Sequence, residues 1–425
     1  MKEYLNRLPH QIQELIRIAA DIAEDEDIEA YLVGGFVRDL ILEVKNLDLD
    51  IVVEAAGIKF AQRLSERLHA RLTEHKRFGT AAVVMAKPHL KVDVATCRKE
   101  FYPQPAQLPV VSKGALEDDL FRRDFTINAM AISINKADFG RSVDFYGGLR
   151  DLKKRHIRIL HDLSFCDDPT RILRAIRFEQ RYNFKIEHRT LKLLRKAVSL
   201  KFLDKVEPQR IRDDLILLLK EKDPLRNIRR LEKLAGLSFI NKKLSLTRKT
   251  DMLLDSIEGQ IAWFNKNFTQ RRFLDSWLMY FIGMLDSLSL RDTKDVCRRF
   301  ALRRGEEKRI LAYKSLNPKL ILELSKKGIQ PTRIFSLLEP LSYETILLIK
   351  AKYSFRQLQI NIADFFQIYN GMRVYVSGQD LKELGVPPGP FYKKIFAQVL
   401  TARVNGLVKS KDEELRLIRK LISKG

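Results

Sequence analysis

Residues 33–39 read VGGFVRD and directly follow a short apolar run that predicts a β-strand. Helical spacing from Phe36 to Leu42 predicts that a helix begins inside this stretch. Gly34 and Gly35 allow backbone N–H groups to approach an anion, and a new helix N-terminus adds positive potential. Arg38, one turn into the helix, could then bind a phosphate. Taken alone, such a turn is more often a plain strand–helix connection.

Residues 46–53 read NLDLDIVV and alternate in polarity, so that Asp48 and Asp50 share one face of a predicted strand, about 7 Å apart along it. Neighbouring carboxylates repel each other unless a divalent cation binds them. A third carboxylate, Asp93, lies in the alternating run at residues 91–95, which could form a strand beside the first. We therefore interpret Asp48 and Asp50 as metal ligands and Asp93 as a further catalytic carboxylate, an arrangement that suits two-metal phosphoryl transfer. The alternative is an exposed acidic strand end.

The fold class follows from how β-like and helical runs are distributed along the chain. Short runs that predict strands alternate with helical stretches from residue 30 to about residue 151, and helical spacing dominates beyond that point. This pattern predicts an α+β head with a mixed β-sheet, followed by all-α regions. The expected domains are residues 1–151, 152–224, 225–350 and 351–425. Residues 101–114, which contain three prolines, predict an extended loop inside the head.

A second informative stretch, residues 168–181, reads DPTRILRAIRFEQR. Pro169 suits the first position of a helix, and Asp168 suits its N-cap. At about 100° per residue, four arginines fall within an arc of roughly 120°, and the apolar residues lie largely opposite. These arginines are Arg171, Arg174, Arg177 and Arg181. Guanidinium groups so arranged repel one another unless they meet phosphate or carboxylate groups.

Asp168 and Arg171 lie one helical turn apart and have the polarity needed to read a nucleobase. A carboxylate accepts from the exocyclic amine of cytosine or adenine, and a guanidinium donates to a ring acceptor, whereas guanine and uracil present the wrong polarity. The alternative is that Asp168 is only a helix cap. Residues 116–130 are dense in charge, and there Arg123 and Asp124 are candidates for sugar and phosphate contacts, or else belong to a solvated loop.

Composition indicates the setting of these motifs. The 425 residues include 78 Lys+Arg and 54 Asp+Glu, which gives a formal charge of +24. A nucleic acid is the simplest partner for this charge, although a basic solvated surface would also explain it. A hydrophobic fraction of 45% excludes wholesale disorder. We find no membrane span and no signal peptide, and three scattered cysteines fit neither a disulfide framework nor a zinc site, so we expect a reducing cytoplasm.

The four stretches, in this order and at these spacings, resemble the class II tRNA nucleotidyltransferases, the CCA-adding family that shares its catalytic head with bacterial poly(A) polymerases. They are residues 33–39, 48–50, 122–130 and 168–178. The resemblance is strong from residue 31 to about residue 219 and loose over the helical remainder, where residues 376–390 are similar to the family's tail segment.

The resemblance implies a head, neck, body and tail, and an enzyme that adds C, C and A to tRNA 3′ ends from CTP and ATP without a nucleic-acid template. It implies that Asp48 and Asp50 bind Mg²⁺, as two ions. The implied nucleotide-binding residues are Gly34, Gly35 and Arg38 for the triphosphate, Arg123 near the sugar, Asp168 and Arg171 for the base, and Arg174 and Arg177 along the pocket. The implied partner is the acceptor–TΨC arm of tRNA, with no membrane and no stable protein partner.

Two departures from the family pattern bear on the exact reaction. The base-reading motif usually begins Glu-Asp, whereas this chain has Asp167-Asp168, and Gln209-Arg210-Ile211 stands where the family often has Glu-Arg-Ile. The second departure lies in the neck and bears on the switch between C and A. The alternatives are an A-adding or CC-adding specialist of the same family, then a poly(A) polymerase, then a non-catalytic RNA-binding protein.

Overall fold

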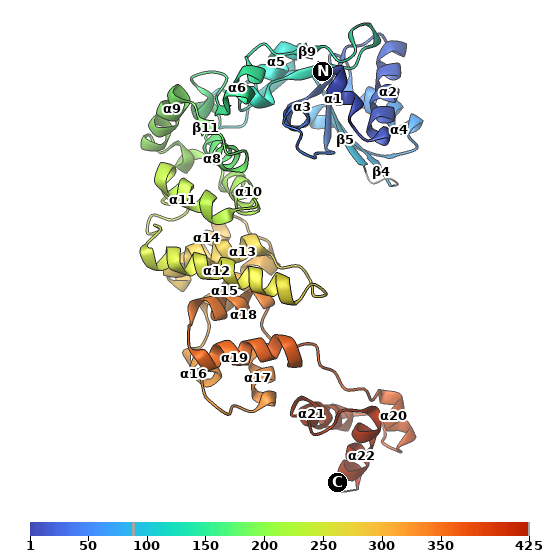
Figure 1. The fold of residues 1–425 in the computed structure, drawn as a ribbon, viewed down its shortest axis with the longest axis vertical. Coiled ribbons are helices and arrows are strands. Elements are labelled where there is room, and N and C mark those ends of the chain that lie inside the picture. The colour runs from blue at the N-terminus through green and yellow to red at the C-terminus, as the bar shows by residue number, and fades with distance from the viewer. Residues whose placement is uncertain (87–89, 424–425) are drawn as a thin grey trace. The chain divides into compact units, whose positions relative to one another are not determined.

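The computed structural model describes residues 1–86 and 90–423. These residues form two compact units, Met1–Phe239 and the part of the chain from Ile240 onward. The first unit contains the β-sheets and the second is helical (Figure 1). The predicted α+β head followed by all-α regions is therefore confirmed as a fold class.

A seven-stranded sheet forms the core of the first unit, in the order β3-β4-β5-β2-β1-β8-β9. Its strands are β1 (Ala30–Val33), β2 (Leu49–Val53), β3 (Arg71–His75), β4 (Thr80–Met85), β5 (Leu90–Thr96), β8 (Ala131–Ser133) and β9 (Ser142–Val143). Strands β2 and β5 pair in parallel, while the other neighbours are antiparallel, so the sheet is mixed as predicted. Every residue of β2 is buried except Asp50, which is partly exposed.

Helices cover this sheet because each of them has an apolar face. They are α1 (Lys2–Asn6), α2 (His10–Asp25), α3 (Gly34–Ile41), α4 (Gly57–Arg67) and α5 (Leu116–Phe121). Helix α4 packs against strands β3, β4 and β5, and α2 packs against α4. The fully buried side chains of Phe60 and Leu64 line the sheet-facing side of α4.

The predicted extended loop at residues 101–114 is wrong in part. Strands β6 (Arg98–Phe101) and β7 (Val110–Lys113) pair in an antiparallel hairpin, and only residues 102–109 connect them. The prolines at residues 103, 105 and 109 all lie outside the two strands, which explains why they do not prevent the pairing.

The rest of the first unit is a helical segment with one small sheet. Its helices are α6 (Gly148–Lys154), α7 (Ser164–Asp167), α8 (Arg171–Arg181), α9 (His188–Ser199), α10 (Pro208–Leu219) and α11 (Pro224–Ala235). Prolines occupy the first turn of α10 and α11, where their missing N–H is not needed. Both helices pack against α8, and the short strands β10 (His156–Ile157) and β11 (Lys185–Ile186) pair in parallel beside it.

The second unit contains no strand between residues 240 and 423. Its helices are α12 (Arg248–Asn267), α13 (Ser276–Met284), α14 (Leu290–Arg299), α15 (Arg304–Lys314), α16 (Pro318–Leu324), α17 (Pro331–Leu338), α18 (Tyr343–Lys352), α19 (Arg356–Asp364), α20 (Gly378–Glu383), α21 (Pro390–Val404) and α22 (Lys411–Ile422). Over residues 1–86 and 90–423, no helix combines the length and the apolar character needed to cross a membrane.

Candidate active site

A hollow of about 670 Å³ lies in the first unit, between strands β2, β4 and β5 and helix α8, which lines it from Arg171 to Arg181. Most of the residues singled out from the sequence line it. They are Gly35, Arg38, Asp50, Asp93, Arg123, Asp124, Asp168, Arg171, Arg174, Arg177 and Arg181. Gly34 and Asp48 are not among the lining residues, although Gly34 approaches both Arg123 and Asp50.

The parallel pairing of β2 with β5 places Asp50 directly opposite Asp93. Asp48 is exposed and precedes the strand, which begins at Leu49, so the prediction of a strand that includes Asp48 is wrong. Burial raises the pKa of Asp50 to about 6, from an ordinary 3.8; Arg123 opposes this rise, and the charges of Asp93 and Asp48 add to it. The three carboxylates therefore interact electrostatically.

The carboxylate of Asp50 has no hydrogen bond and no ion pair with any described residue, whereas Asp93 accepts a hydrogen bond from Lys91 at 2.6 Å. Within the described part of the chain, no three His, Cys, Asp or Glu side chains form a ready metal-binding group. Even so, an unpaired carboxylate beside two others is the type of oxygen donor that a hard divalent cation prefers. The residues present therefore fit such a cation.

The glycine turn before α3 needs a glycine at one position. Gly34 has a φ of +70°, and a Cβ atom there would lie 2.5 Å from Nη1 of Arg123 and 3.5 Å from Oδ2 of Asp50. Helix α3 begins at this residue, two positions before the predicted start at Phe36. Gly34 thus lets Arg123 lie close to the carboxylate of Asp50.

Arg38 is buried beneath the hollow and is already held by other side chains. Its guanidinium donates to both carboxylate oxygens of Asp39, at 2.8 and 2.9 Å, and to the amide oxygen of Asn128. It also lies over the ring of Tyr182, 4.7 Å from the centroid. These contacts fix its orientation, and Asp39 and Asn128 had not been identified from the sequence.

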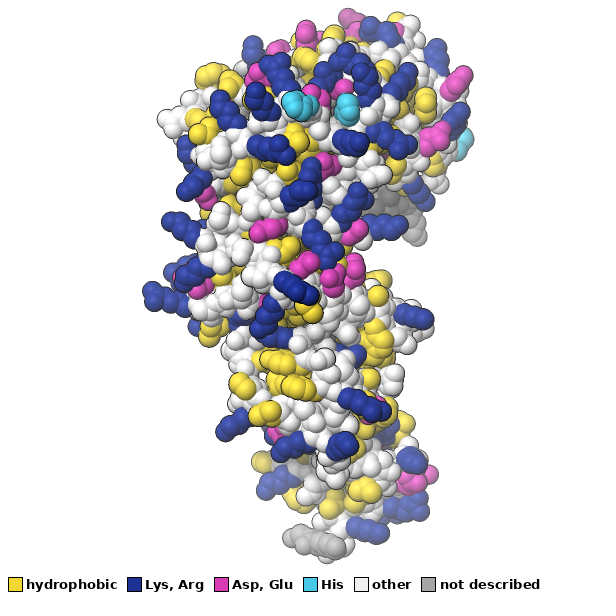
Figure 2. All heavy atoms as spheres, turned by 60° about the vertical axis from the view of Figure 1, so that its left-hand side comes forward, with side chains coloured by type: hydrophobic (Ala, Val, Ile, Leu, Met, Phe, Trp, Pro, Cys, Tyr) yellow, Lys and Arg dark blue, Asp and Glu magenta, His cyan; other side chains and the backbone are white. Residues whose placement is uncertain are grey.

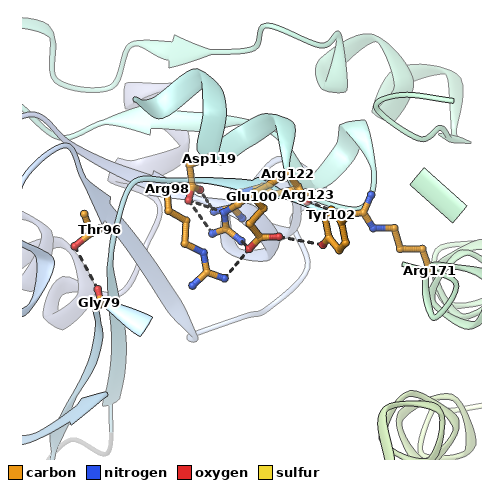
Figure 3. Close-up of polar contacts among 9 residues, drawn as sticks. All are labelled: Gly79, Thr96, Arg98, Glu100, Tyr102, Asp119, Arg122, Arg123 and Arg171. Carbon is orange, nitrogen blue, oxygen red and sulfur yellow. Dashed lines mark hydrogen bonds and ion pairs between the residues drawn. The ribbon is translucent and has the colours of Figure 1, made fainter. Parts of the chain in front are cut away.

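Arg123 belongs to a network that Figure 3 shows around Asp119 and Glu100. Asp119 is fully buried and accepts from Arg122 at 2.7 Å and from Arg123 at 2.9 Å. Burial alone would raise the pKa of Asp119, but Arg123 and Arg122 lower it below its ordinary value. The i, i+3 and i, i+4 spacing from Asp119 to the two arginines is a sequence signal that could have identified this residue.

Glu100 and Tyr102 also lie at the hollow and were missed, because the sequence analysis assigned them to, or next to, a loop. Glu100 accepts hydrogen bonds from Arg98 at 2.9 Å, from Arg122 at 3.2 Å and from the hydroxyl of Tyr102 at 3.1 Å (Figure 3). The hairpin β6–β7 is thereby linked through Glu100 to Arg122, the first of the two arginines that follow α5.

Helix α8 begins at Arg171 with Thr170 as N-cap, so the predicted start at Pro169 with Asp168 as N-cap is wrong. Asp168 nevertheless accepts from the backbone N–H and the hydroxyl of Thr170, at 3.1 and 2.7 Å. Arg171 is 4% exposed and donates to Oγ of Ser164 at 2.9 Å and to the carbonyl oxygen of Arg122 at 2.8 Å.

The charges along α8 are largely paired with carboxylates. Arg174 contacts Asp124 at 2.6 Å, and although burial alone would raise the pKa of Asp124, this guanidinium lowers it to about 2. Arg181 lies 3.5 Å from Glu221. The predicted repulsion between the four arginines is therefore relieved within the protein itself.

Two guanidinium N–H groups at the hollow differ from the rest. The Nε atoms of Arg123 and Arg177 are buried and have no hydrogen-bond partner in the described structure. A buried donor without a partner is unfavourable, and a ligand in the hollow would reach these two atoms only if the arginine side chains moved. The hollow thus combines carboxylates that suit a divalent cation with arginine donors that suit a phosphate, as binding of a nucleoside triphosphate requires.

Comparison with known protein families supports this chemistry. Residues 30–158 match the family described as poly A polymerase head domain, and residues 183–245 match the family described as probable RNA and SrmB-binding site of polymerase A. The first match contains both strands that carry Asp50 and Asp93, and it ends before α8.

Two curated relatives align with almost the whole chain. The A-adding tRNA nucleotidyltransferase of Geobacter sulfurreducens is 36% identical over 98% of this chain and 48% of its own length. The A-adding tRNA nucleotidyltransferase of Halalkalibacterium halodurans is 30% identical over 96% of this chain and 92% of its own length. The chain belongs to the class II tRNA nucleotidyltransferase family. It spans about half the length of the Geobacter relative and 39% of an A-adding relative from Aquifex aeolicus.

Solved structures of the class II tRNA nucleotidyltransferases have the same fold. A CCA-adding enzyme in an apo form has a TM-score of 0.79 and 35% identity, over 98% of this chain and 97% of the other. The Thermotoga maritima CCA-adding enzyme complexed with tRNA has a TM-score of 0.74 and 34% identity, over 100% of this chain and 98% of the other. Complexes of a CCA-adding enzyme with ATP and with CTP both have a TM-score of 0.75.

Proposed function

We propose that this chain is a template-independent tRNA nucleotidyltransferase that adds all or part of the 3′-terminal CCA from CTP and ATP. The observation that carries this proposal is that the unpaired carboxylate of Asp50 and the arginines of α8 face one hollow. In the reaction, the tRNA 3′-hydroxyl attacks the α-phosphate of the bound nucleotide. The bond between the α- and β-phosphates breaks, pyrophosphate leaves, and the hydroxyl proton passes to solvent.

Asp50 and Asp48 are the residues that would bind Mg²⁺, as two ions, and Asp93 would contribute a third negative charge beside them. When bound, Mg²⁺ lowers the pKa of the attacking hydroxyl and offsets the charge of the triphosphate. The chain's own contribution is placement. Gly34 and Gly35, the first two residues of α3, would hold the triphosphate together with Arg38: Gly34 leaves space for the Arg123 side chain, and Gly35 and Arg38 line the hollow.

On the α8 side of the hollow, Arg123 would contact the nucleotide near its sugar, and Arg177 would line the same pocket. Asp168 and Arg171 would read the base, because a carboxylate acceptor and a guanidinium donor match cytosine and adenine. Arg174 would also line the pocket, although its charge is paired with Asp124.

The tRNA partner is supported by the net charge of +24 and by the distribution of that charge. Figure 2 shows Lys and Arg side chains spread over the face that it presents, with fewer Asp and Glu side chains among them. Such a surface binds a nucleic-acid backbone chiefly through its phosphates. We propose that residues 1–151 form the catalytic head, residues 152–224 the neck, and residues 225–350 and 351–425 a body and tail that hold the acceptor–TΨC arm, in the cytoplasm and without a stable protein partner.

Within this function, addition of A alone is a second candidate. The relatives from Geobacter and Halalkalibacterium, which align with 98% and 96% of this chain, are both named A-adding enzymes, whereas two relatives from Lactococcus lactis that align with 92% and 93% are named CCA-adding enzymes. The base-reading pair is compatible with this candidate, since adenine presents the same amine and ring acceptor as cytosine.

The test uses three tRNA transcripts, one ending at the discriminator base, one carrying CC and one carrying CCA. Each is incubated with the protein, Mg²⁺ and single or mixed nucleoside triphosphates, and the added residues are counted on a sequencing gel. We expect addition of CCA to the first transcript, or of A to the second, with no extension of the third.

The other outcomes distinguish the alternatives. Arrest after CC on the first transcript would identify a CC-adding enzyme. A long ladder of A on any RNA would identify a poly(A) polymerase. No addition to any transcript, together with tight tRNA binding, would contradict the proposed catalysis and favour an RNA-binding protein.

A further inference from the structure

The contacts of Asp168 are all made by one of its two carboxylate oxygens. Oδ1 accepts from the backbone N–H and the hydroxyl of Thr170, at 3.1 and 2.7 Å, and forms an ion pair with Nη2 of Arg210 at 2.8 Å. Oδ2 has no hydrogen bond or ion pair with any residue of the described chain. The lining of the hollow includes Asp168, so this second oxygen is available to a ligand.

Arg210 reaches Asp168 from a different element of the fold. It lies in the first turn of α10, which packs against α8, and its side chain is 24% exposed. Its Nη1 donates to the carbonyl oxygen of Ala106 at 3.2 Å, in the segment that connects β6 and β7. Since the two ends of the guanidinium are held by different acceptors, its position relative to Asp168 is well determined.

Arg171, the other member of the base-reading pair, is held separately. Its guanidinium donates to Ser164 and to the carbonyl oxygen of Arg122, and no ion pair within 4.0 Å joins it to Asp168 in the described chain. Opposite charges three residues apart at a helix start readily pair with each other. If Asp168 turned toward Arg171, each would satisfy the other and neither would be free for a base.

We propose that Arg210 is a positioning residue that determines base selectivity, because it holds Oδ1 of Asp168 and so keeps Oδ2 available to the exocyclic amine of the incoming base. This inference rests on the proposed function. Arg210 itself does not touch the nucleotide, and it is not among the residues that line the hollow. Its effect is on which base is accepted and on how tightly, and the phosphoryl transfer itself takes place elsewhere in the hollow.

The test compares Arg210→Gln with Arg212→Gln. Both variants remove one arginine from α10, but Arg212 contacts Asp213 at 2.7 Å, whereas Arg210 contacts Asp168. Addition of ATP, CTP, GTP and UTP to the transcript that wild type extends is measured at several nucleotide concentrations. We expect Arg210→Gln to lower the preference for ATP over GTP, or for CTP over UTP, by about tenfold, since the ion pair that holds Asp168 is lost.

The loss should come mainly from a raised KM for the preferred nucleotide, with kcat at saturation changed less than threefold. Arg212→Gln should keep the wild-type preference. Arg210→Lys retains the charge and one donor, so it should restore part of the selectivity. Melting curves of all variants show whether they are folded. If Arg210→Gln does not fold, Arg210→Lys takes its place as the test.

An equal fall in kcat for all four nucleotides, or an unchanged preference, would contradict the inference while leaving the proposed function intact. If wild type adds no nucleotide, the proposed function fails on its own. In that case the equilibrium dissociation constants of ATP and GTP, measured for wild type and for Arg210→Gln, still test the inference. It requires that wild type binds ATP more tightly than GTP and that Arg210→Gln loses this preference.

Discussion

Strand β2, which carries Asp50, and helix α8, which carries Arg174, differ in how their charges are paired. Asp50 is largely buried without any hydrogen bond or ion pair in the described chain, and its pKa rises to about 6. Arg174 is paired with Asp124, whose pKa falls to about 2. Two aspartates that line one hollow thus have pKa values shifted in opposite directions.

This difference in pairing indicates which charged side chains stabilise the fold and which are available to bind a ligand. A carboxylate that is paired inside the protein stabilises the folded state at neutral pH, whereas an unpaired one destabilises it until an external cation binds. The arginines of α8 therefore mainly stabilise the fold through their ion pairs. Asp50 on strand β2, in contrast, carries a charge that no described residue neutralises through an ion pair. Four predictions test this comparison.

The largest effect is expected at the strand edge. Asp50→Ala, and likewise Asp48→Ala, should lower the rate of nucleotide addition by at least about 10³-fold, because the metal ligands are lost. Binding of tRNA, measured by gel shift, should stay close to wild type because it depends on phosphate contacts elsewhere. Glu43→Gln, which removes an exposed carboxylate outside the hollow, is the control. Turnover at the wild-type rate in either aspartate variant would refute the metal assignment.

On the helix side, Asp124→Asn should destabilise the protein by roughly 3 kcal/mol at neutral pH, since Arg174 loses its partner. A depressed pKa means that Asp124 stabilises the fold above its unfolded pKa of about 3.8, and that this stabilisation is lost as the pH falls toward 2. The melting difference between variant and wild type should therefore shrink below pH 4. Asp162→Asn breaks an exposed ion pair with Arg189 and should change little. Equal melting of the two variants would contradict the structural role of Asp124.

Arg171→Ala should relax base choice more than it weakens tRNA binding. Loss of one base-reading group reduces discrimination by roughly 10- to 100-fold, so GTP and UTP should be added more readily relative to ATP and CTP. The measurement is kcat/KM for each of the four nucleotides on one transcript. A selectivity identical to that of wild type would remove Arg171 from the base-reading pair.

The smallest effect concerns the turn before α3. Gly34→Ala introduces a side chain at a φ of +70° and a Cβ atom 2.5 Å from Arg123, and it should cost about 1 kcal/mol of stability and also lower activity. Gly236→Ala has a similar φ of +67° with open space around it, so it should match the loss of stability without a loss of activity. Parallel melting and addition assays compare the two. Full activity of Gly34→Ala would show that the position of Arg123 beside Asp50 is not needed.

The sequence predicted the elements whose signals are local. The alternating run at residues 91–95 was expected to form a strand beside β2, and strand β5 spans Leu90–Thr96 there, because its apolar residues alternate without interruption. The carboxylate pair followed from the same alternation on two strands. The hairpin β6–β7 was missed, since its strands are only four residues long with no buried residue and its connecting segment carries the prolines that suggested a loop.

Contacts between distant residues could not be predicted from local patterns. The ion pair between Arg210 and Asp168 depends on how α10 packs against α8, and the bond from Arg122 to Glu100 depends on how the hairpin meets α5. The pKa shift of Asp50 also requires knowledge of burial, which the sequence gives only for the apolar positions beside it. The charge pattern thus indicated most of the charged side chains that line the hollow, but not how they are held.

The most direct test of the contrast between the two sides is the melting temperature of wild type and Asp50→Asn. A pKa raised from 3.8 to about 6 means that ionised Asp50 destabilises the fold progressively from pH 4 to pH 6, by on the order of 2–3 kcal/mol above that range. At pH 7.5 in EDTA, Asp50→Asn should therefore melt above wild type, and the difference should vanish at pH 4. With Mg²⁺ and ATP the order should reverse, because only wild type binds them tightly. A wild type that melts at or above the variant in EDTA, or an equal gain for both with Mg²⁺ and ATP, would contradict the account.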